Sequence, residues 1–352
     1  MKKIAVVFGG KSPEHKISVR SAKNVVAALD RNQYDLCFIG IDQQGVWRLV
    51  DIDAVAEVVK PEGRVISLVP GMKDPIVLQD SAEALKGIDL LYLILHGPNG
   101  EDGTVQGLAR MLNIPFIGPD VLGSSVAMDK DYSKRLLAAA GVNVAPGIVV
   151  ANFEKPNLDY SKISKELGTP MFIKPANMGS SVGVHKVEDE TTFWAALEDA
   201  FLYDHKVLIE QMIEGRELEC AVMGNDFPKA STIGEVITPE EYSYEEKYSS
   251  ESSTEVKIPA DLPAETAKAL QEVAKKAYRA LRCEVLSRVD MFLADSGEIY
   301  VNEINTLPGF TSISMYPQLW AYEGYTYSEL IDQLITYAIE RHTAHKALKT
   351  DW

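Results

Sequence analysis

The first hundred residues alternate short runs rich in strand-forming residues with a helical pattern. Apolar runs at residues 4–8, 35–41 and 90–95 have the length and composition of strands, and residues 18–29 have helical periodicity. Parallel strands need a long crossover connection, so a strand, a helix and a second strand in this order predict a parallel sheet. We therefore expect an N-terminal α/β domain that binds its ligand at the carboxyl edge of the sheet.

Two further structured segments come next, which suits a chain of 352 residues because domains commonly contain roughly 100 to 200 residues. For the second segment the pattern predicts a helix at 130–140, strands at 171–174, 182–187 and 207–211, and a helix at 191–203. For the third it predicts a strand at 217–223, a helix at 264–281, strands at 284–293 and 298–304, and a terminal helix from about 326.

Acidic residues outnumber basic ones by 51 to 35, and the net charge is −16. Such a surface repels phosphate backbones and anionic lipid headgroups, which disfavours nucleic-acid binding and a membrane-surface role. Cys37, Cys220 and Cys283 are far apart and predict neither a disulfide framework nor a zinc site. No apolar run approaches the ~20 residues that span a bilayer, and the N-terminus lacks the apolar stretch of a secretion signal. We expect a cytoplasmic protein.

Two charged segments near the C-terminus have the pattern of paired strands, joined by a predicted two-residue turn at 296–297. This turn would place Asp290 opposite Glu303 and Arg288 opposite Asn305. All four side chains would then share one face, whereas a three-residue turn would move Glu303 to the other. Two carboxylates and an amide suit Mg²⁺ bound to nucleotide phosphates, and the arginine could neutralise developing negative charge. A solvated edge strand with ordinary alternating charges is the alternative.

A second candidate site combines a lysine with a loop of small residues. Lys174 ends a predicted strand, and the Gly-Ser-Ser-Val-Gly stretch at 179–183 offers backbone N–H groups. Together they could hold a polyphosphate, although the same loop could be an ordinary hairpin connection. Glu210 and Glu217 could accept hydrogen bonds from an adenine amino group and a ribose hydroxyl, or they could be solvated acids.

Three loops could also face a ligand. His96 comes after the apolar strand at 90–95 in a glycine-rich loop, where it could contact a ligand or be a structural histidine. The Gly-Gly-Lys-Ser stretch at 9–12 is not a P-loop, because Ala5 replaces the first required glycine. The polar stretch at 242–254 has no regular period and is predicted to be a lid or binding loop, with a plain surface loop as the alternative.

Taken in order, these segments resemble the D-alanine:D-alanine ligases of the ATP-grasp superfamily over nearly the whole chain. The matching segments are 9–15 (GGKSPEH), 96–103, 128–130 (MDK), 173–175, 179–183, 245–248 (EEKY), 288–290 (RVD) and 302–311 (NEINTLPGFT). The resemblance implies a three-domain α/β fold with ATP between the central and C-terminal domains. These domains would be an N-terminal parallel-sheet (Rossmann-like), substrate-binding domain at 1–122, a central α+β lid domain at 123–213, and a C-terminal α+β domain at 214–352 with the metal site and a lid loop at 240–256.

The resemblance also implies a reaction, the ATP-dependent joining of two D-alanine molecules for peptidoglycan precursor synthesis. The γ-phosphoryl group of ATP would pass to the carboxylate of the first D-alanine, and the amine of the second would attack the D-alanyl phosphate. This chemistry needs positioned substrates and stabilised negative charge rather than a covalent nucleophile. Two Mg²⁺ ions, with Mn²⁺ as a possible substitute, and a homodimer are implied as well.

Roles for individual residues rest on the resemblance alone. The first D-alanine would contact Glu14 and His96, and the second would contact Ser314 and Met315. The nucleotide would contact Lys130, Lys174, Ser181, Glu210, Glu217 and Lys247. The Mg²⁺ ligands would be Asp290, Glu303 and Asn305. The tetrahedral oxyanion would be stabilised by Arg288 and the backbone N–H of Gly309. A hydrogen-bonded triad that closes the lid loop and excludes water would consist of Glu14, Ser180 and Tyr248.

Other activities within the superfamily remain as alternatives. Related ligases that use D-lactate as the second substrate typically depart from tyrosine at the position of Tyr248. This residue therefore favours an amine as the attacking group of the second substrate. D-serine remains an alternative second substrate. A catalytically silent nucleotide-binding protein would lack a metal ligand or the oxyanion arginine, and this sequence has both. A different ATP-grasp carboxylate ligase would not be expected to combine Glu14 with the Glu-Lys-Tyr lid.

Overall fold

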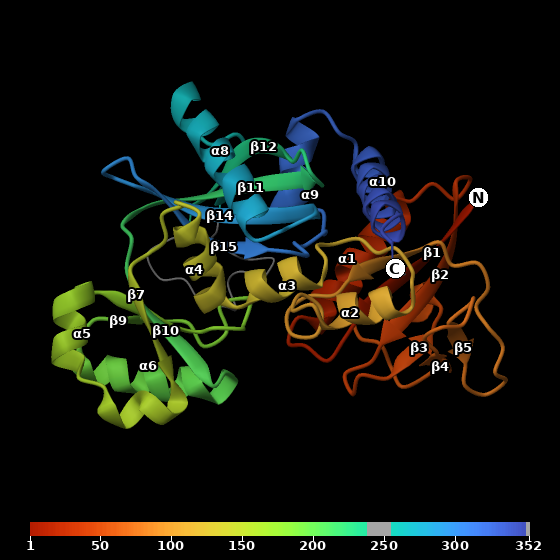
Figure 1. The fold of residues 1–352 in the computed structure, drawn as a ribbon, viewed down its shortest axis with the longest axis horizontal. Helices are drawn as coiled ribbons and strands as arrows, with labels where there is room; N and C mark the ends of the chain where they lie inside the picture. The colour runs from red at the N-terminus through yellow and green to blue at the C-terminus, as the bar shows by residue number, and fades with distance from the viewer. Residues whose placement is uncertain (238–254, 350–352) are drawn as a thin grey trace.

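Three β-sheets, one after another along the chain, organise the protein (Figure 1). The computed structural model describes residues 1–237 and 255–349. It confirms the mixed α/β class and the parallel strands expected near the N-terminus. Within the described ranges, no helix is long and apolar enough to cross a membrane.

The N-terminal sheet has the strand order β5-β4-β3-β2-β1-β6, with β1 parallel to both β2 and β6. Its elements are β1 (Lys2–Gly9), α1 (His15–Ala28), β2 (Tyr34–Ile41), β3 (Trp47–Leu49), η1 (Ile52–Ala54), β4 (Arg64–Leu68), β5 (Ile76–Leu78), β6 (Leu90–Ile94) and α2 (Thr104–Met111). The chain leaves β1 through α1 toward β2, while β6 lies on the other side of β1. The carboxyl ends of β1 and β6 therefore flank the point where the strand order reverses, which is where ligands bind in such sheets. The short strands β3 to β5 were not predicted.

The central sheet is antiparallel, in the order β7-β10-β8-β9. Its elements are β7 (Gly147–Ala151), η2 (Asn152–Asn157), α5 (Tyr160–Leu167), β8 (Met171–Pro175), β9 (His185–Val187), α6 (Glu190–Tyr203) and β10 (Lys206–Gln211). Phe193 and Leu197 of α6 are completely buried in the core beneath this sheet. The strand predicted from residue 182 starts at His185, because the preceding loop has left-handed backbone at Ser180 and Ser181.

The C-terminal sheet is also antiparallel, in the order β13-β12-β11-β14-β15. Its elements are β11 (Gly215–Gly224), β12 (Lys229–Ile237), β13 (Glu255–Lys257), α8 (Ala264–Ala280), β14 (Val285–Ala294), β15 (Ile299–Asn305), α9 (Met315–Tyr322) and α10 (Tyr327–Lys346). Helix α10 returns to the N-terminal part (Figure 1), where Arg341 donates hydrogen bonds to the carbonyls of Phe116 and Gly118. The N-terminal and C-terminal parts consequently share one core.

Two helices before the central sheet, α3 (Val121–Met128) and α4 (Lys130–Ala139), pack with the C-terminal sheet. Ala127 of α3 and Leu137 of α4 lie in the same buried core as Leu218 and Val289 of that sheet. The core beneath β7 to β10 contains neither helix. Residues 147–211 therefore form a unit of their own, called here the central unit, and α3 and α4 belong to the C-terminal part.

The hairpin of β14 and β15 has the predicted pairing at the candidate site but not the predicted turn. Asp290 lies opposite Glu303 and Arg288 opposite Asn305, as expected. Nearer the turn, however, the register differs by one residue, and Ala294 pairs with Glu298 across a three-residue turn that ends at Gly297 (φ +87°). A β-bulge at Asn302 adds one residue to β15 and restores the register at Glu303. The prediction of a two-residue turn was wrong. The bulge cancels the register shift of the three-residue turn, so the predicted pairing of Asp290 with Glu303 still forms.

Candidate active site

Glu14, at the start of α1, lies where the N-terminal part meets the central unit. It is buried, and its carboxylate accepts a hydrogen bond from the hydroxyl of Ser180. Ser180 and Ser181 have φ of +53° and +57°, a left-handed backbone that is uncommon for residues other than glycine. Gly97 (φ +72°) allows the loop after β6 to approach, since a Cβ at this position would lie 2.6 Å from a Glu14 oxygen.

Two residues of the loop after β6, the buried His96 and the half-buried Glu101, bind the loop after β15. The Nδ1–H of His96 donates to the carbonyl of Leu307 at 2.9 Å, and burial lowers the pKa of His96 against the opposing effect of Glu14. Glu101 accepts hydrogen bonds from the backbone N–H groups of Gly97 at 2.8 Å and Leu307 at 3.1 Å. Burial, helped by the charge of Glu14, raises the pKa of Glu101 to about 8. The sequence had suggested no role for Glu101, whose partner is about two hundred residues away.

Glu210 on β10 is the centre of a buried cluster of charges. Its carboxylate lies 2.6 Å from the ammonium of Lys174 on β8 and 2.7 Å from that of Lys134 on α4. Burial by itself would raise the pKa of Glu210, but the two lysine charges outweigh this effect and lower it. Burial and the charge of Lys174 lower the pKa of Lys134 to about 8. Lys134 was not predicted, although it comes about one helical turn after Lys130 and so shares its face.

The two lysines predicted to contact phosphate face the C-terminal sheet. The ammonium of Lys130 donates to the carbonyl of Met178 at 2.7 Å and lies 3.4 Å from Glu303. The ammonium of Lys174 donates to the side-chain oxygen of Asn302 at 3.2 Å. Buried positive charge from α4 and β8 thus meets polar oxygens of β15, in the space between the central and C-terminal sheets.

The face of β14 and β15 predicted to bind metal is extended by a third carboxylate from β11. Arg288 donates two hydrogen bonds of 2.7 Å to Asp290, and its Nε lies 2.9 Å from Glu219. Asn305 donates to Asp290 at 2.9 Å. Glu219 lies directly opposite Asp290 in the sheet, so Glu219, Asp290 and Glu303 form a row across three strands. The contribution of Glu219 depends on the register of β11, which the sequence did not provide.

The oxygen donors of Asp290, Glu303 and Asn305 have the chemistry that Mg²⁺ requires. In the parts of the chain that the structure describes, no three His, Cys, Asp or Glu side chains are grouped closely enough to hold an ion. Asp290 is instead hydrogen-bonded to Arg288 and Asn305. An ion bound there would have to replace these bonds, and substrate oxygens would have to complete its coordination.

The segment from the end of β15 to the first residue of α9 carries three of the predicted residues. Gly309 passes close to Ser314, since a Cβ on the glycine would lie 2.9 Å from the serine hydroxyl. That hydroxyl accepts a hydrogen bond from the backbone N–H of Thr311 at 2.9 Å. Met315 is buried in the core, with its sulfur close beneath Gly234 of β12. The structure therefore brings Gly309 and Ser314 together, and it packs Met315 into the interior.

The remaining predicted residues lie on β11 and in the expected lid loop. Glu217 is half-buried on β11, on the same face as Glu219 because strand side chains alternate. Lys247, Tyr248 and residues 240–254 of the lid loop lie outside the described residues.

Two antiparallel sheets, with Lys174 of the central sheet contacting Asn302 of the C-terminal sheet and Lys130 of α4 beside Glu303, define an enzyme of the ATP-grasp class. Residues 3–119 match the family model described as D-ala D-ala ligase N-terminus, and residues 136–336 match the one described as D-ala D-ala ligase C-terminus. The chain belongs to the D-alanine–D-alanine ligase family, whose members are ATP-dependent ligases.

Individual relatives agree with this assignment over the full length. D-alanine–D-alanine ligase of Shouchella clausii is 49% identical, covering 99% of this chain and 98% of the relative, and ligase A of Escherichia coli K12 is 45% identical with the same coverage. Among solved structures, the Coxiella burnetii ligase has a TM-score of 0.86 at 35% identity, covering 98% of this chain and 97% of that one. The VanG D-Ala:D-Ser ligase of Enterococcus faecalis has a TM-score of 0.84 at 34% identity, with 96% and 99% covered. The Bacillus anthracis ligase complexed with ATP has a TM-score of 0.77 at 30% identity, with 98% and 100% covered.

Proposed function

We propose that this protein joins two D-alanine molecules to D-alanyl-D-alanine, with ATP as phosphoryl donor, for peptidoglycan precursor synthesis. The observation that carries the proposal is that side chains from the N-terminal part, the central unit and the C-terminal sheet contact one another at a single site. Glu14 of the N-terminal part is hydrogen-bonded to Ser180 of the central unit, and Lys174 of the central unit is hydrogen-bonded to Asn302 of the C-terminal sheet. Full-length similarity to D-alanine–D-alanine ligases supports the same reaction.

The first step transfers the γ-phosphoryl group of ATP to a carboxylate oxygen of the first D-alanine, which gives D-alanyl phosphate and ADP. Glu14 binds the ammonium group of this substrate, and the neutral ring of His96 lies near its carboxylate. Transfer spreads negative charge over the phosphoryl oxygens, so the buried ammonium groups of Lys130 and Lys174 favour the transition state over the ground state.

The remaining nucleotide contacts are proposed from the same arrangement. Ser181 donates to a phosphate oxygen, Glu210 accepts from the adenine amino group, and Glu217 accepts from the ribose. Lys247 reaches the nucleotide from the lid loop. The lysine cluster around Glu210 supports this assignment, since it fixes the carboxylate in its ionised, accepting form.

In the second step the amine of the second D-alanine attacks the acyl phosphate carbon, and inorganic phosphate leaves from the tetrahedral intermediate. Arg288 and the backbone N–H of Gly309 stabilise the oxyanion, and Ser314, with the buried Met315 behind it, forms the pocket of the second substrate. The triad of Glu14, Ser180 and Tyr248 excludes water, which would otherwise hydrolyse the acyl phosphate.

Asp290, Glu303 and Asn305 are proposed to hold two Mg²⁺ ions, for which Mn²⁺ could substitute. When bound, the ions neutralise phosphate charge and orient the polyphosphate. The three side chains offer oxygen atoms as ligands, and this supports magnesium as the metal.

The proposed enzyme has three domains: a substrate-binding domain at 1–122, a lid domain and a C-terminal domain. Because α3 and α4 pack with the C-terminal sheet, their packing favours a lid domain that starts near residue 147 rather than 123. We further propose a homodimer in the cytoplasm, which light scattering and cell fractionation can test.

D-serine is the second candidate for the attacking substrate, because the VanG D-Ala:D-Ser ligase is similar to this chain over nearly its whole length. Phosphate release from Mg-ATP distinguishes the possibilities when measured with D-alanine alone, L-alanine, D-alanine plus D-serine, D-alanine plus D-lactate, or no amino acid. We expect release that depends on D-alanine, with an equal amount of D-alanyl-D-alanine. A mixed product formed in preference would transfer the assignment to that second substrate, and no stimulation by any D-amino acid would refute ligation.

A further inference from the structure

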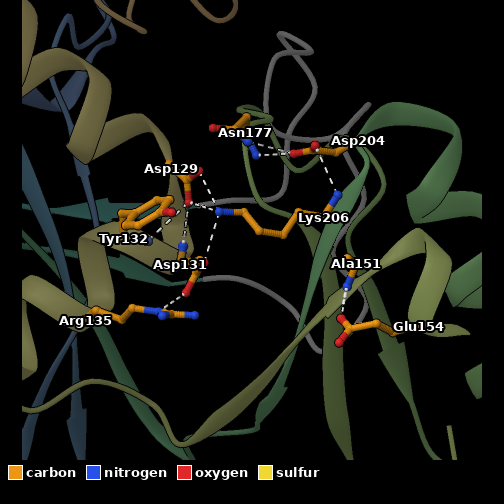
Figure 2. A network of polar contacts seen from close by, with 9 residues as sticks. All are labelled: Asp129, Asp131, Tyr132, Arg135, Ala151, Glu154, Asn177, Asp204 and Lys206. Carbon is orange, nitrogen blue, oxygen red and sulfur yellow. Dashed lines mark hydrogen bonds and ion pairs between the residues drawn. The ribbon is translucent and has the colours of Figure 1, made fainter. Parts of the chain in front are cut away.

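A cluster of charges outside the proposed active site joins β10 of the central unit to α4. The ammonium of Lys206, the first residue of β10, lies 2.8 and 2.7 Å from the two carboxylate oxygens of Asp129 and 3.0 Å from Asp131. The same ammonium lies over the ring of Tyr132, 4.5 Å from its centre. Figure 2 shows the ammonium between the two carboxylates.

The two sides of this cluster belong to different parts of the fold. Lys206 is on the central sheet, whereas Asp129 and Asp131 begin α4, which packs with the C-terminal sheet. Asp129 is also the N-cap of α4, because its side chain accepts from the backbone N–H groups of Asp131 and Tyr132. The cap fixes the carboxylate, so Lys206 contacts a rigid partner.

Backbone hydrogen bonds connect the cluster to the proposed phosphate-binding residues. Ala176 donates to the carbonyl of Lys206 at 3.0 Å, and the N–H of Lys130 donates to the carbonyl of Ala176 at 3.0 Å. Asp204 accepts from the backbone and side chain of Asn177, at 2.8 and 2.9 Å, and from the N–H of Lys206 at 3.2 Å. These bonds fix both the start of α4, which carries Lys130, and the start of the loop that carries Ser180.

We propose that Lys206 is a positioning residue for ATP binding, which holds the start of α4 against the central unit so that Lys130 and the 179–183 loop meet the phosphates together. This inference rests on the proposed function, because it takes Lys130 and that loop as the phosphate site. Lys206 itself does not touch the nucleotide.

The other charges in the cluster explain why the loss of Lys206 should change the position of α4. Asp129 and Asp131 are two residues apart and repel each other, and Arg135 pairs with Asp131 at 2.5 Å. Without Lys206, Asp129 would lose the only ammonium contact that the described residues give it, and both ion pairs that join the start of α4 to β10 would be lost. The start of α4 would then be free to move away from the central unit, which would take Lys130 away from Met178 and open the gap in which the phosphates would lie.

The test compares three variants by calorimetric titration with ATP in the presence of Mg²⁺, and by steady-state kinetics. Lys206→Met removes the charge, and Lys206→Arg retains it. Lys155→Met is the matched control, because Lys155 has similar side-chain exposure (26% against 22%) and pairs with Glu198 entirely within the central unit. We expect Lys206→Met to raise the Kd and KM for ATP about tenfold, with the KM for D-alanine unchanged, since small displacements of binding groups have effects of this size.

Lys206→Arg should restore ATP affinity to within about threefold of the parent protein, because an arginine can bridge both carboxylates. An unchanged ATP affinity in Lys206→Met, or an equal loss in Lys155→Met, would overturn the proposal. If Lys206→Met does not fold, Asp131→Asn removes one contact and should weaken ATP binding in the same direction. ATP titration needs no turnover, so a protein that binds ATP but makes no dipeptide would refute the proposed function and leave this test intact.

Discussion

Arg288 and Asp290 stand two positions apart on one strand and are joined by two parallel hydrogen bonds of 2.7 Å. Asp290 is buried, and Glu219 contacts the arginine from the neighbouring strand at 2.9 Å. The proposed metal ligand is therefore neutralised by the residue proposed to stabilise the oxyanion. A cation bound at Asp290 would therefore compete with Arg288 for this carboxylate.

Arg288→Met should lower kcat by roughly 100-fold or more, because one donor to a developing oxyanion has an effect of this size. ATP binding should persist, and the Mg²⁺ concentration needed for it should fall, since Asp290 loses a competing cation. Kinetics and ATP titration at several Mg²⁺ concentrations measure both effects. Arg216→Met is the control, because Arg216 pairs with Glu235 on the opposite face of the same sheet. Normal turnover in Arg288→Met would remove Arg288 from the catalytic residues.

Lys134→Met should reduce the free energy of unfolding by about 1–3 kcal/mol, because Glu210 would remain buried with one lysine instead of two. Urea denaturation measures the change. Lys275→Met breaks an exposed ion pair with Glu272 and should cost less than about 1 kcal/mol. Equal effects of the two substitutions would show that the buried cluster contributes no special stability.

Glu101 should make the protein less stable as the pH rises from about 4.5 to about 8. In this window the folded protein keeps a proton on Glu101 that the unfolded chain releases, so the free energy of unfolding falls with rising pH. Glu101→Gln removes the titration and should flatten this part of the profile, measured by urea denaturation at each pH. Glu166→Gln, at an exposed position on α5, should leave the slope unchanged. A Glu101→Gln profile as steep as that of the parent protein would contradict the raised pKa.

Ser180→Ala should raise the KM for D-alanine about tenfold, because Glu14 loses a hydrogen bond to a charged acceptor. The ratio of phosphate released to dipeptide formed should also rise, since water would reach the acyl phosphate more easily. Tyr248→Phe should raise the same ratio. Ser164→Ala on α5 serves as control. A ratio that stays at one in both variants would argue against the water-excluding triad.

The strands and helices were largely predictable because their signals are local. Residues 4–8 and 90–95 are continuous apolar runs, as strands buried on both faces require, and they form β1 and β6. Helix α1 begins at His15 rather than at residue 18, since its first turn has no apolar period. Boundaries depend on capping and packing, which a periodic pattern does not contain.

The pairing of Asp290 with Glu303 was predicted correctly from an incorrect turn. A three-residue turn shifts the register by one, and the bulge at Asn302 shifts it back. Neither feature has a unique sequence signal, because Ser-Gly fits turns of either length and a bulge reflects how the sheet as a whole packs.

The order of the elements was predictable from the amino-acid sequence because hydrophobic period is a local property, and the ATP-grasp family and most of the residues proposed for the site followed from the resemblance of its ordered motifs to that family. Three features came from the packed fold instead: Lys134 joins Glu210, Glu219 contacts Arg288, and α4 packs with the C-terminal sheet. These contacts join residues far apart in the chain, and their geometry depends on how three sheets pack together, which no local pattern encodes.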